Sequence, residues 1–244
     1  MKIFLDTNLL IALIEKTNIN LPIEHEYYTF EKCIYEFKSG IKRKFVSPDF
    51  ILDNLKAHKS QKNILDKNDA TNRIAKYIMQ NVLQTLQYNE NELINLRNAI
   101  KRYNLYYEFG IAEEYEYVEI ERDSDIGLMK NFFKQVKLYL RNYSYDIESD
   151  ISSNKINVIL FDQVFGNSYE ILNFREILDT CFINPKDLEI VYTALSFYCK
   201  IFLTSDKPLV KECLSLGLNH CTNFVYINPE NIESEILNIL SEYK

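Results

Sequence analysis

Glycine and proline are scarce in this chain of 244 residues, which contains five of each. Aromatic residues make up 14 % of the sequence, and this composition argues against disorder, because disordered chains are poor in aromatic residues. We find no internal repeat, no low-complexity tract and no linker rich in proline or glycine. At this length the chain can bury a hydrophobic core in one large domain or two small ones.

Cysteine and histidine are also few. The five cysteines are dispersed, no two have C-x-x-C spacing, and the chain has three histidines. These numbers argue against a zinc site or a disulfide framework and favour a reducing compartment. No run of about 18 apolar residues occurs, so we expect no membrane-spanning helix. Asp6 and Asn8 interrupt the apolar start, which argues against a secretory signal, and we predict a cytoplasmic protein.

A strong positive charge is absent. The net charge is −7, from 28 basic and 35 acidic residues, which excludes a uniformly basic nucleic-acid-binding protein. The charges are nevertheless segregated, because residues 37–67 carry eight basic side chains and residues 108–125 carry eight acidic ones. The basic segment favours a polyanionic partner and makes Lys56, Lys59 and Lys62 candidate substrate-binding residues. The alternative is a pair of ordinary solvated faces.

Predicted strands and helices alternate at both ends of the chain. We predict strands at residues 3–5, 44–47, 201–203 and 224–227, and helices after Asp6, over 26–39, and from Pro48, Pro185, Pro208 and Pro229. Asn184 is the expected cap of the helix that begins at Pro185. This alternation predicts an α/β fold with a parallel sheet.

The middle of the chain is predicted to be mostly helical. Apolar residues recur at helical spacing in three stripes: Ile74, Ile78, Val82 and Leu86; Leu93, Leu96 and Ile100; and Leu128, Phe132, Val136 and Leu140. Two short strands are expected in this part, at residues 115–120 and 158–161.

Four aspartates lie where a sheet of this kind gathers functional groups. Asp6 and Asp206 follow predicted strands, Asp187 lies in the first turn of a helix, and Asp53 lies on a helix just after a strand. Carboxyl ends of parallel strands share one edge, so these carboxylates are expected to converge and repel one another. A divalent cation relieves such repulsion, and hard oxygen ligands select Mg²⁺ or Mn²⁺. Taken singly, Asp6 is also an ordinary helix cap and Asp206 an ordinary turn residue. Asp187 is also a common partner of the helix dipole, and Asp53 an ordinary solvated helix position.

Three stretches resemble the PIN-domain family of metal-dependent nucleases. Residues 3–10 (IFLDTNLL) match the opening strand, first acid and following Thr and Asn; residues 187–194 (DLEIVYTA) match the acidic helix; and residues 203–207 (LTSDK) match the T-x-D turn. The resemblance implies a PIN-like three-layer fold with a central parallel sheet flanked by helices. It divides the chain into a core (1–64 and 166–244) and a large, mostly helical insertion (65–165).

The resemblance also assigns roles to individual residues. It implies that Asp6, Asp187 and Asp206 bind Mg²⁺ or Mn²⁺, that Asp53 takes part in catalysis, and that Thr7, Asn8 and Thr204 orient the acids. The family's second acid is usually a Glu on the helix after the second strand. When the position of this acid is counted along the chain from Ser47, it falls on Asp53. When it is counted from Pro48, it falls on Asn54.

The function implied is a metal-dependent endoribonuclease that hydrolyses phosphodiester bonds of RNA. The main alternative is a catalytically silent PIN-like module that binds RNA or protein. A haloacid-dehalogenase-like phosphatase also begins with a strand and an Asp, but it requires a second Asp where this chain has Asn8. A further alternative is the toxin of a toxin–antitoxin pair, whose partner is an antitoxin.

Overall fold

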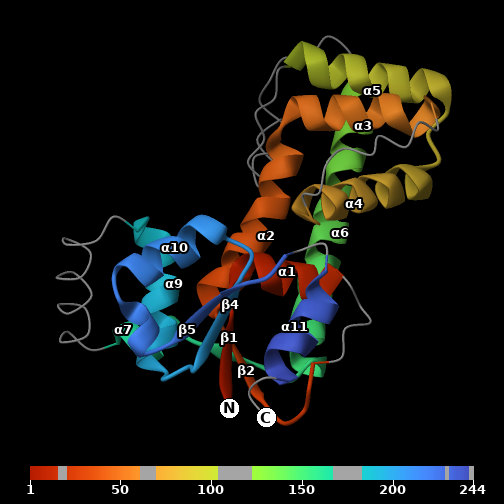
Figure 1. Cartoon of the computed structure of the whole chain (residues 1–244). Helices are drawn as coiled ribbons and strands as arrows, with labels where there is room; N and C mark the ends of the chain where they lie inside the picture. Colours follow the sequence, from red (N-terminus) through yellow and green to blue (C-terminus); the bar gives the residue numbers. More distant parts are fainter. Residues whose placement is uncertain (16–20, 61–69, 104–122, 167–182, 229–230, 242–244) are drawn as a thin grey trace. The chain divides into compact units, whose positions relative to one another are not determined.

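The computed structural model describes residues 1–15, 21–60, 70–103, 123–166, 183–228 and 231–241 (Figure 1). They form two compact units, which we call the sheet unit (residues 1–37 and 147–244) and the helical unit (residues 38–146). The boundaries between the units fall within α2 (Glu31–Val46) and α6 (Asp123–Ser153).

A five-stranded sheet forms the centre of the sheet unit. Its strands are β1 (Lys2–Leu5), β2 (Glu26–Phe30), β3 (Ile156–Ile159), β4 (Ile201–Thr204) and β5 (Asn223–Tyr226). Their order is β3-β2-β1-β4-β5, and every neighbouring pair is parallel. The predicted α/β class with a parallel sheet is therefore confirmed. The order reverses between β1 and β4, and such a switch point is where α/β sheets commonly bind ligands.

The two central strands form the core of this unit. β4 is buried along its whole length, and so are residues 3–5 of β1. The Phe4 and Phe202 rings stack with their centroids 5.2 Å apart. Continuous apolar runs of this kind are typical of parallel strands that are covered on both faces.

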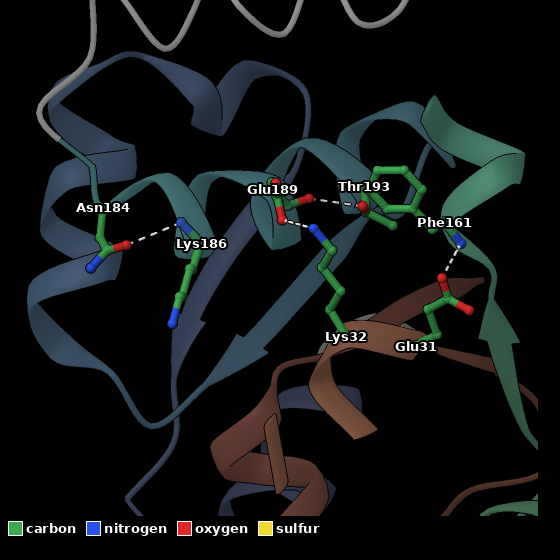
Figure 2. Close-up of polar contacts among 7 residues, drawn as sticks. All are labelled: Glu31, Lys32, Phe161, Asn184, Lys186, Glu189 and Thr193. Atoms are coloured by element: carbon green, nitrogen blue, oxygen red, sulfur yellow. Dashed lines mark hydrogen bonds and ion pairs between the residues drawn. The ribbon is translucent and has the colours of Figure 1, made fainter. Parts of the chain in front are cut away.

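Helices cover the sheet. The sheet unit contains α1 (Thr7–Glu15), α7 (Phe161–Phe165), α9 (Pro185–Ser196), α10 (Lys207–Ser215), the 3-10 helix η2 (Leu218–His220) and α11 (Ile232–Ser241). Figure 1 shows α9 and α10 on one side of the sheet and α1 and α11 on the other. The start of α9 is as predicted, because the Asn184 side chain accepts a hydrogen bond from the Lys186 N–H and Pro185 is the first helical residue (Figure 2).

The helical unit contains α3 (Pro48–Ser60), α4 (Ala70–Leu86) and α5 (Glu90–Tyr103), with parts of α2 and α6. The apolar stripes predicted for this part of the chain lie on helices α4, α5 and α6, and most of their residues are buried. The prediction of a mostly helical middle is therefore confirmed for the described residues. The strand predicted at 115–120 lies outside them.

The second strand was predicted in the wrong place. Residues 26–30, expected to be helical, form β2, and residues 44–46, expected to be a strand, end helix α2. Phe37, Ile41 and Phe45 are spaced four residues apart and are all buried, so Phe45 continues a helical stripe. In contrast, aromatic and β-branched residues dominate β2, which is paired on both sides by parallel strands.

The bounds of the predicted insertion also differ from the structure. β3 lies within residues 65–165, yet it pairs with β2, with Phe30 opposite Ile159. The helical unit begins earlier than the predicted insertion, at Lys38, and ends earlier, at Asp146. The reason is that β3 provides an edge strand of the sheet, so the chain around it belongs to the sheet unit. None of the described helices is both long enough and apolar enough to cross a membrane.

Candidate functional site

Asp6 lies at the switch point, directly after β1. Its N–H donates to the Leu203 carbonyl oxygen over 3.0 Å, so Asp6 continues the ladder between β1 and β4. The side chain is buried, and both carboxylate oxygens accept hydrogen bonds. The Thr7 N–H donates to Oδ1 over 2.7 Å, and the Thr204 hydroxyl donates to Oδ2 over 2.6 Å. These bonds fix the orientation of the carboxylate.

Thr7 joins Asp6 to a second acid. Its hydroxyl donates to Glu36 Oε2 over 2.9 Å, while its N–H binds Asp6. Glu36 lies on α2, the helix that follows β2. One buried threonine therefore holds two carboxylates that are 30 positions apart.

Asp206 is connected to the same network through Thr204. Its N–H donates to the Thr204 hydroxyl oxygen over 3.0 Å, and its Oδ1 accepts a hydrogen bond from the Leu209 N–H over 2.9 Å. Asp206 is thus the N-cap of α10, as the helix-cap interpretation expects. Asp187 lies in the first turn of α9 and is partly buried.

The pKa of two of these carboxyl groups is raised. Burial raises the pKa of Asp6 to about 6; the hydrogen bonds from Thr204 and Thr7 oppose this rise, and the negative charges of Asp187 and Glu36 add to it. Burial also raises the pKa of Asp187, as do the charges of Glu36, Asp206 and Glu212. We call Asp6, Glu36, Asp187 and Asp206 the acidic cluster. Its members come from four separate segments of the chain, and negative charges within it raise the pKa of Asp6 and of Asp187.

The donor set of the acidic cluster suits a hard divalent cation, because carboxylate oxygens are the ligands that Mg²⁺ and Mn²⁺ prefer. The side chains as they stand are not arranged as a complete site. In the parts of the chain that the structure describes, no three His, Cys, Asp or Glu side chains form a group that could hold a metal ion.

An ion pair connects α2, which carries Glu36, with α9, which carries Asp187. Figure 2 shows Lys32 of α2 reaching Glu189 of α9, and the two side chains form an ion pair. Lys32 precedes Glu36 by one helical turn, and Glu189 follows Asp187 by two residues. The Lys32 ammonium also lies 4.6 Å from the centroid of the Phe161 ring. This contact connects α2 to α9 beside the acidic cluster.

Comparison with known proteins adds no assignment. No family model matches the chain, and searches of curated proteins and of solved structures found no match. Function therefore has to be inferred from the side chains at this edge of the sheet.

Asp53 has different surroundings from the three other predicted acids. It lies on α3 in the helical unit, its side chain is 66 % exposed, and its Oδ1 accepts a hydrogen bond from Lys56 over 3.5 Å. Its charge is not among those that raise the pKa of Asp6 or Asp187. Asn54 donates to the Phe50 carbonyl oxygen within the same helix. Asp53 and Asn54 therefore each contact a residue of their own helix, α3.

Glu36 is a member of the acidic cluster that the sequence analysis did not single out. The expected second acid was a Glu on the helix after the second strand, and placing that strand at 44–47 led to Asp53. With the strand at β2, the following helix is α2, and it carries Glu36, which accepts a hydrogen bond from Thr7. The run of aromatic and β-branched residues in Tyr27–Phe30 was the signal that could have revealed the strand before it.

The other predicted residues divide into two groups. Thr7 and Thr204 contact the acids as expected, whereas Asn8 is exposed. All three candidate lysines belong to the helical unit. Lys56 is exposed and paired with Asp53, whereas the Lys59 side chain and the whole of Lys62 lie outside the described residues.

Proposed function

We propose that this protein is a metal-dependent endoribonuclease that hydrolyses phosphodiester bonds through the acidic cluster. The observation that carries the proposal is the clustering of Asp6, Glu36, Asp187 and Asp206 at the switch point, with a raised pKa at Asp6 and Asp187. Neighbouring carboxylate charges lower the stability of the fold when no cation neutralises them. Groups with a raised pKa of this kind are commonly found at functional sites. The resemblance of residues 3–10, 187–194 and 203–207 to PIN nucleases supports the same function.

The residues of the acidic cluster have different proposed roles. Asp6, Asp187 and Asp206 are the proposed ligands of Mg²⁺ or Mn²⁺, and Glu36 takes the place that the sequence analysis gave to Asp53. When bound, the cation supplies an activated water and neutralises charge on the phosphate. Thr204 and Thr7 hold Asp6 by its two oxygens, so its orientation is set before a cation or substrate arrives. The choice of RNA over DNA follows from the family resemblance.

A matched pair of variants tests the proposal. Glu36→Gln removes one charge from the cluster, and Asp53→Asn removes one from an exposed helix position. With Mn²⁺ and a mixed single-stranded RNA, we expect Glu36→Gln to lose cleavage by about 100-fold or more, the order of magnitude for losing a group that stabilises the transition state. Asp53→Asn should cleave like the wild type. Equal cleavage by Glu36→Gln and the wild type would contradict the proposal.

The alternative is a catalytically silent module that binds RNA or protein. One observation favours it: among the described residues, no three acidic, His or Cys side chains already form a metal-binding group. A silent module would show no cleavage with either cation and no change in melting temperature when Mn²⁺ is added. A nuclease would show both, and both would depend on Asp6.

A further inference from the structure

Tyr226 lies in the same row of the sheet as Asp6. In the β4–β5 ladder Thr204 pairs with Tyr226, and in the β1–β4 ladder Leu5 pairs with Leu203. Asp6, the residue directly after β1, is therefore level with Thr204, whose hydroxyl donates to it. Paired residues of parallel strands project to the same face of a sheet, so Asp6, Thr204 and Tyr226 form one row at the carboxyl edge. Two strand spacings separate Asp6 from Tyr226, which is about 10 Å.

The Tyr226 ring is partly open to solvent and is accompanied by a cation. The residue is 37 % exposed at the end of an edge strand, and the Lys207 ammonium lies 5.8 Å from the centroid of its ring. Lys207 directly follows Asp206 and is exposed. An aromatic ring two strand spacings from Asp6 is therefore paired with a cation that follows Asp206 in the chain.

We propose that Tyr226 and Lys207 form a nucleotide-binding subsite for single-stranded nucleic acid next to the acidic cluster. The Tyr226 ring stacks on a base, and the Lys207 ammonium pairs with a phosphate of the same strand. Aromatic rings stack on any base that is not held in a duplex, and a neighbouring cation provides the contact to the backbone. This inference rests on the proposed function, because it assigns the substrate of the same site.

Charge explains why such a subsite is needed. The carboxylates of Asp187 and Asp206 repel a phosphate backbone, and Lys207 offsets this repulsion at the point where the strand approaches. Stacking adds affinity that does not depend on charge. Removing an aromatic ring that stacks on a base typically lowers affinity by about 5- to 100-fold.

The absence of tryptophan provides a direct probe of stacking. Because the chain has no Trp, a Tyr226→Trp variant carries a single indole at the proposed subsite. Tyr198→Trp is the matched control. Tyr198 is 81 % exposed and precedes β4, so it lies at the amino ends of the strands and not at their carboxyl ends. The probe is a short single-stranded RNA with a terminal dye, added in EDTA so that it is not cut. Dye anisotropy measures binding, and indole fluorescence measures stacking.

We expect the RNA to quench the indole of Tyr226→Trp and to leave the indole of Tyr198→Trp unchanged. An abasic strand of the same length should not quench the Tyr226→Trp variant, since it has phosphates but no bases. Tyr226→Ala should bind about 5- to 100-fold more weakly, and Tyr226→Phe should bind like the wild type because it keeps the ring. Lys207→Met should weaken binding and reduce the slope of log K against log salt concentration by about one.

The outcomes separate this inference from the proposed function. Bound RNA that leaves the Tyr226→Trp indole unquenched, or Tyr226→Ala that binds like the wild type, would overturn the subsite even if Mn²⁺-dependent cleavage is observed. Quenching of that indole in EDTA, together with no RNA cleavage when Mn²⁺ is supplied, would support the subsite and overturn the nuclease. Tyr226→Trp and Tyr226→Phe retain an aromatic ring at the sheet edge, so they test stacking even if Tyr226→Ala does not fold.

Discussion

Thr204 donates its hydroxyl hydrogen bond to Asp6 over 2.6 Å, although 198 positions separate the two residues in the chain. The same hydroxyl oxygen accepts the N–H of Asp206 over 3.0 Å. One threonine therefore connects acids from the two ends of the chain. Its bond to Asp6 lowers the pKa of a carboxyl group that burial raises to about 6.

Replacing Thr204 by valine tests this connection. Valine keeps the shape of the side chain but removes the hydroxyl, so Asp6 loses its shortest hydrogen bond. We expect the pKa of Asp6 to rise further and the free energy of unfolding at neutral pH to fall by about 1–3 kcal/mol. Urea unfolding measures the second effect, and carboxyl NMR titration the first. Thr204→Ser is the control and should stay close to the wild type, whereas an unchanged pKa in Thr204→Val would contradict the assignment.

The metal-free protein should lose stability as the pH rises from about 4 to about 6. The pKa of Asp6 is about 6 in the folded state and 3.8 as a reference, so the folded protein binds more protons than the unfolded chain over this range. The charged form is the one disfavoured by folding, and its cost reaches about 3 kcal/mol above pH 6. The raised pKa of Asp187 acts in the same direction.

This pH dependence is measured by urea unfolding in EDTA, with Asp6→Asn compared with the wild type at each pH. The stability difference between the two proteins should shift in favour of Asp6→Asn between pH 4 and 6 and then level off. A constant difference across this range would mean that Asp6 ionises with an ordinary pKa.

Divalent cations should stabilise the wild type through the acidic cluster. A cation at about 100 times its Kd adds about 2.7 kcal/mol, which corresponds to a rise in Tm of about 5–10 °C for a chain of this size. Asp6→Asn removes one ligand and one repelling charge, so we expect it to be at least as stable as the wild type without metal and to gain little from Mg²⁺.

Asp53→Asn is the control for this experiment, because it removes one carboxylate that is exposed and lies in the helical unit. It should respond to Mg²⁺ as the wild type does. If Asp6→Asn gained as much in Tm as the wild type, the metal site would not include Asp6.

The ion pair between Lys32 and Glu189 should contribute modestly to stability. The two side chains are 37 % and 24 % exposed, so solvent screens their attraction. A double-mutant cycle with Lys32→Met and Glu189→Gln is expected to give a coupling energy of about 0.5–1 kcal/mol that decreases at high salt. A coupling energy of zero at low salt would show that the ion pair does not stabilise the contact between α2 and α9.

Local sequence rules predicted several elements of this fold. The start of α9 depends on Asn184 and Pro185, which are adjacent to the turn that they stabilise. The central strands β1 and β4 were recognisable because each is a continuous apolar run ending in a polar turn. These features were predictable because the residues that determine them are neighbours in the chain.

The position of the second strand was not predictable in the same way. Residues 26–30 and 44–46 are both rich in aromatic or β-branched side chains. Only the first segment finds a partner on each side, β1 and β3, and β3 is contributed by residues more than a hundred positions later. The second segment instead buries Phe45 along the stripe of α2.

The sequence by itself determined that Asp6 and Asp206 follow strands and that Asp187 begins a helix, because strand ends and helix caps are local. Only the tertiary structure decided that Glu36 joins them, while Asp53 is an exposed residue of another unit. The physical reason is that a parallel sheet pairs strands that are remote in the chain. Which helix follows the neighbouring strand, and therefore which acid reaches the switch point, depends on that pairing.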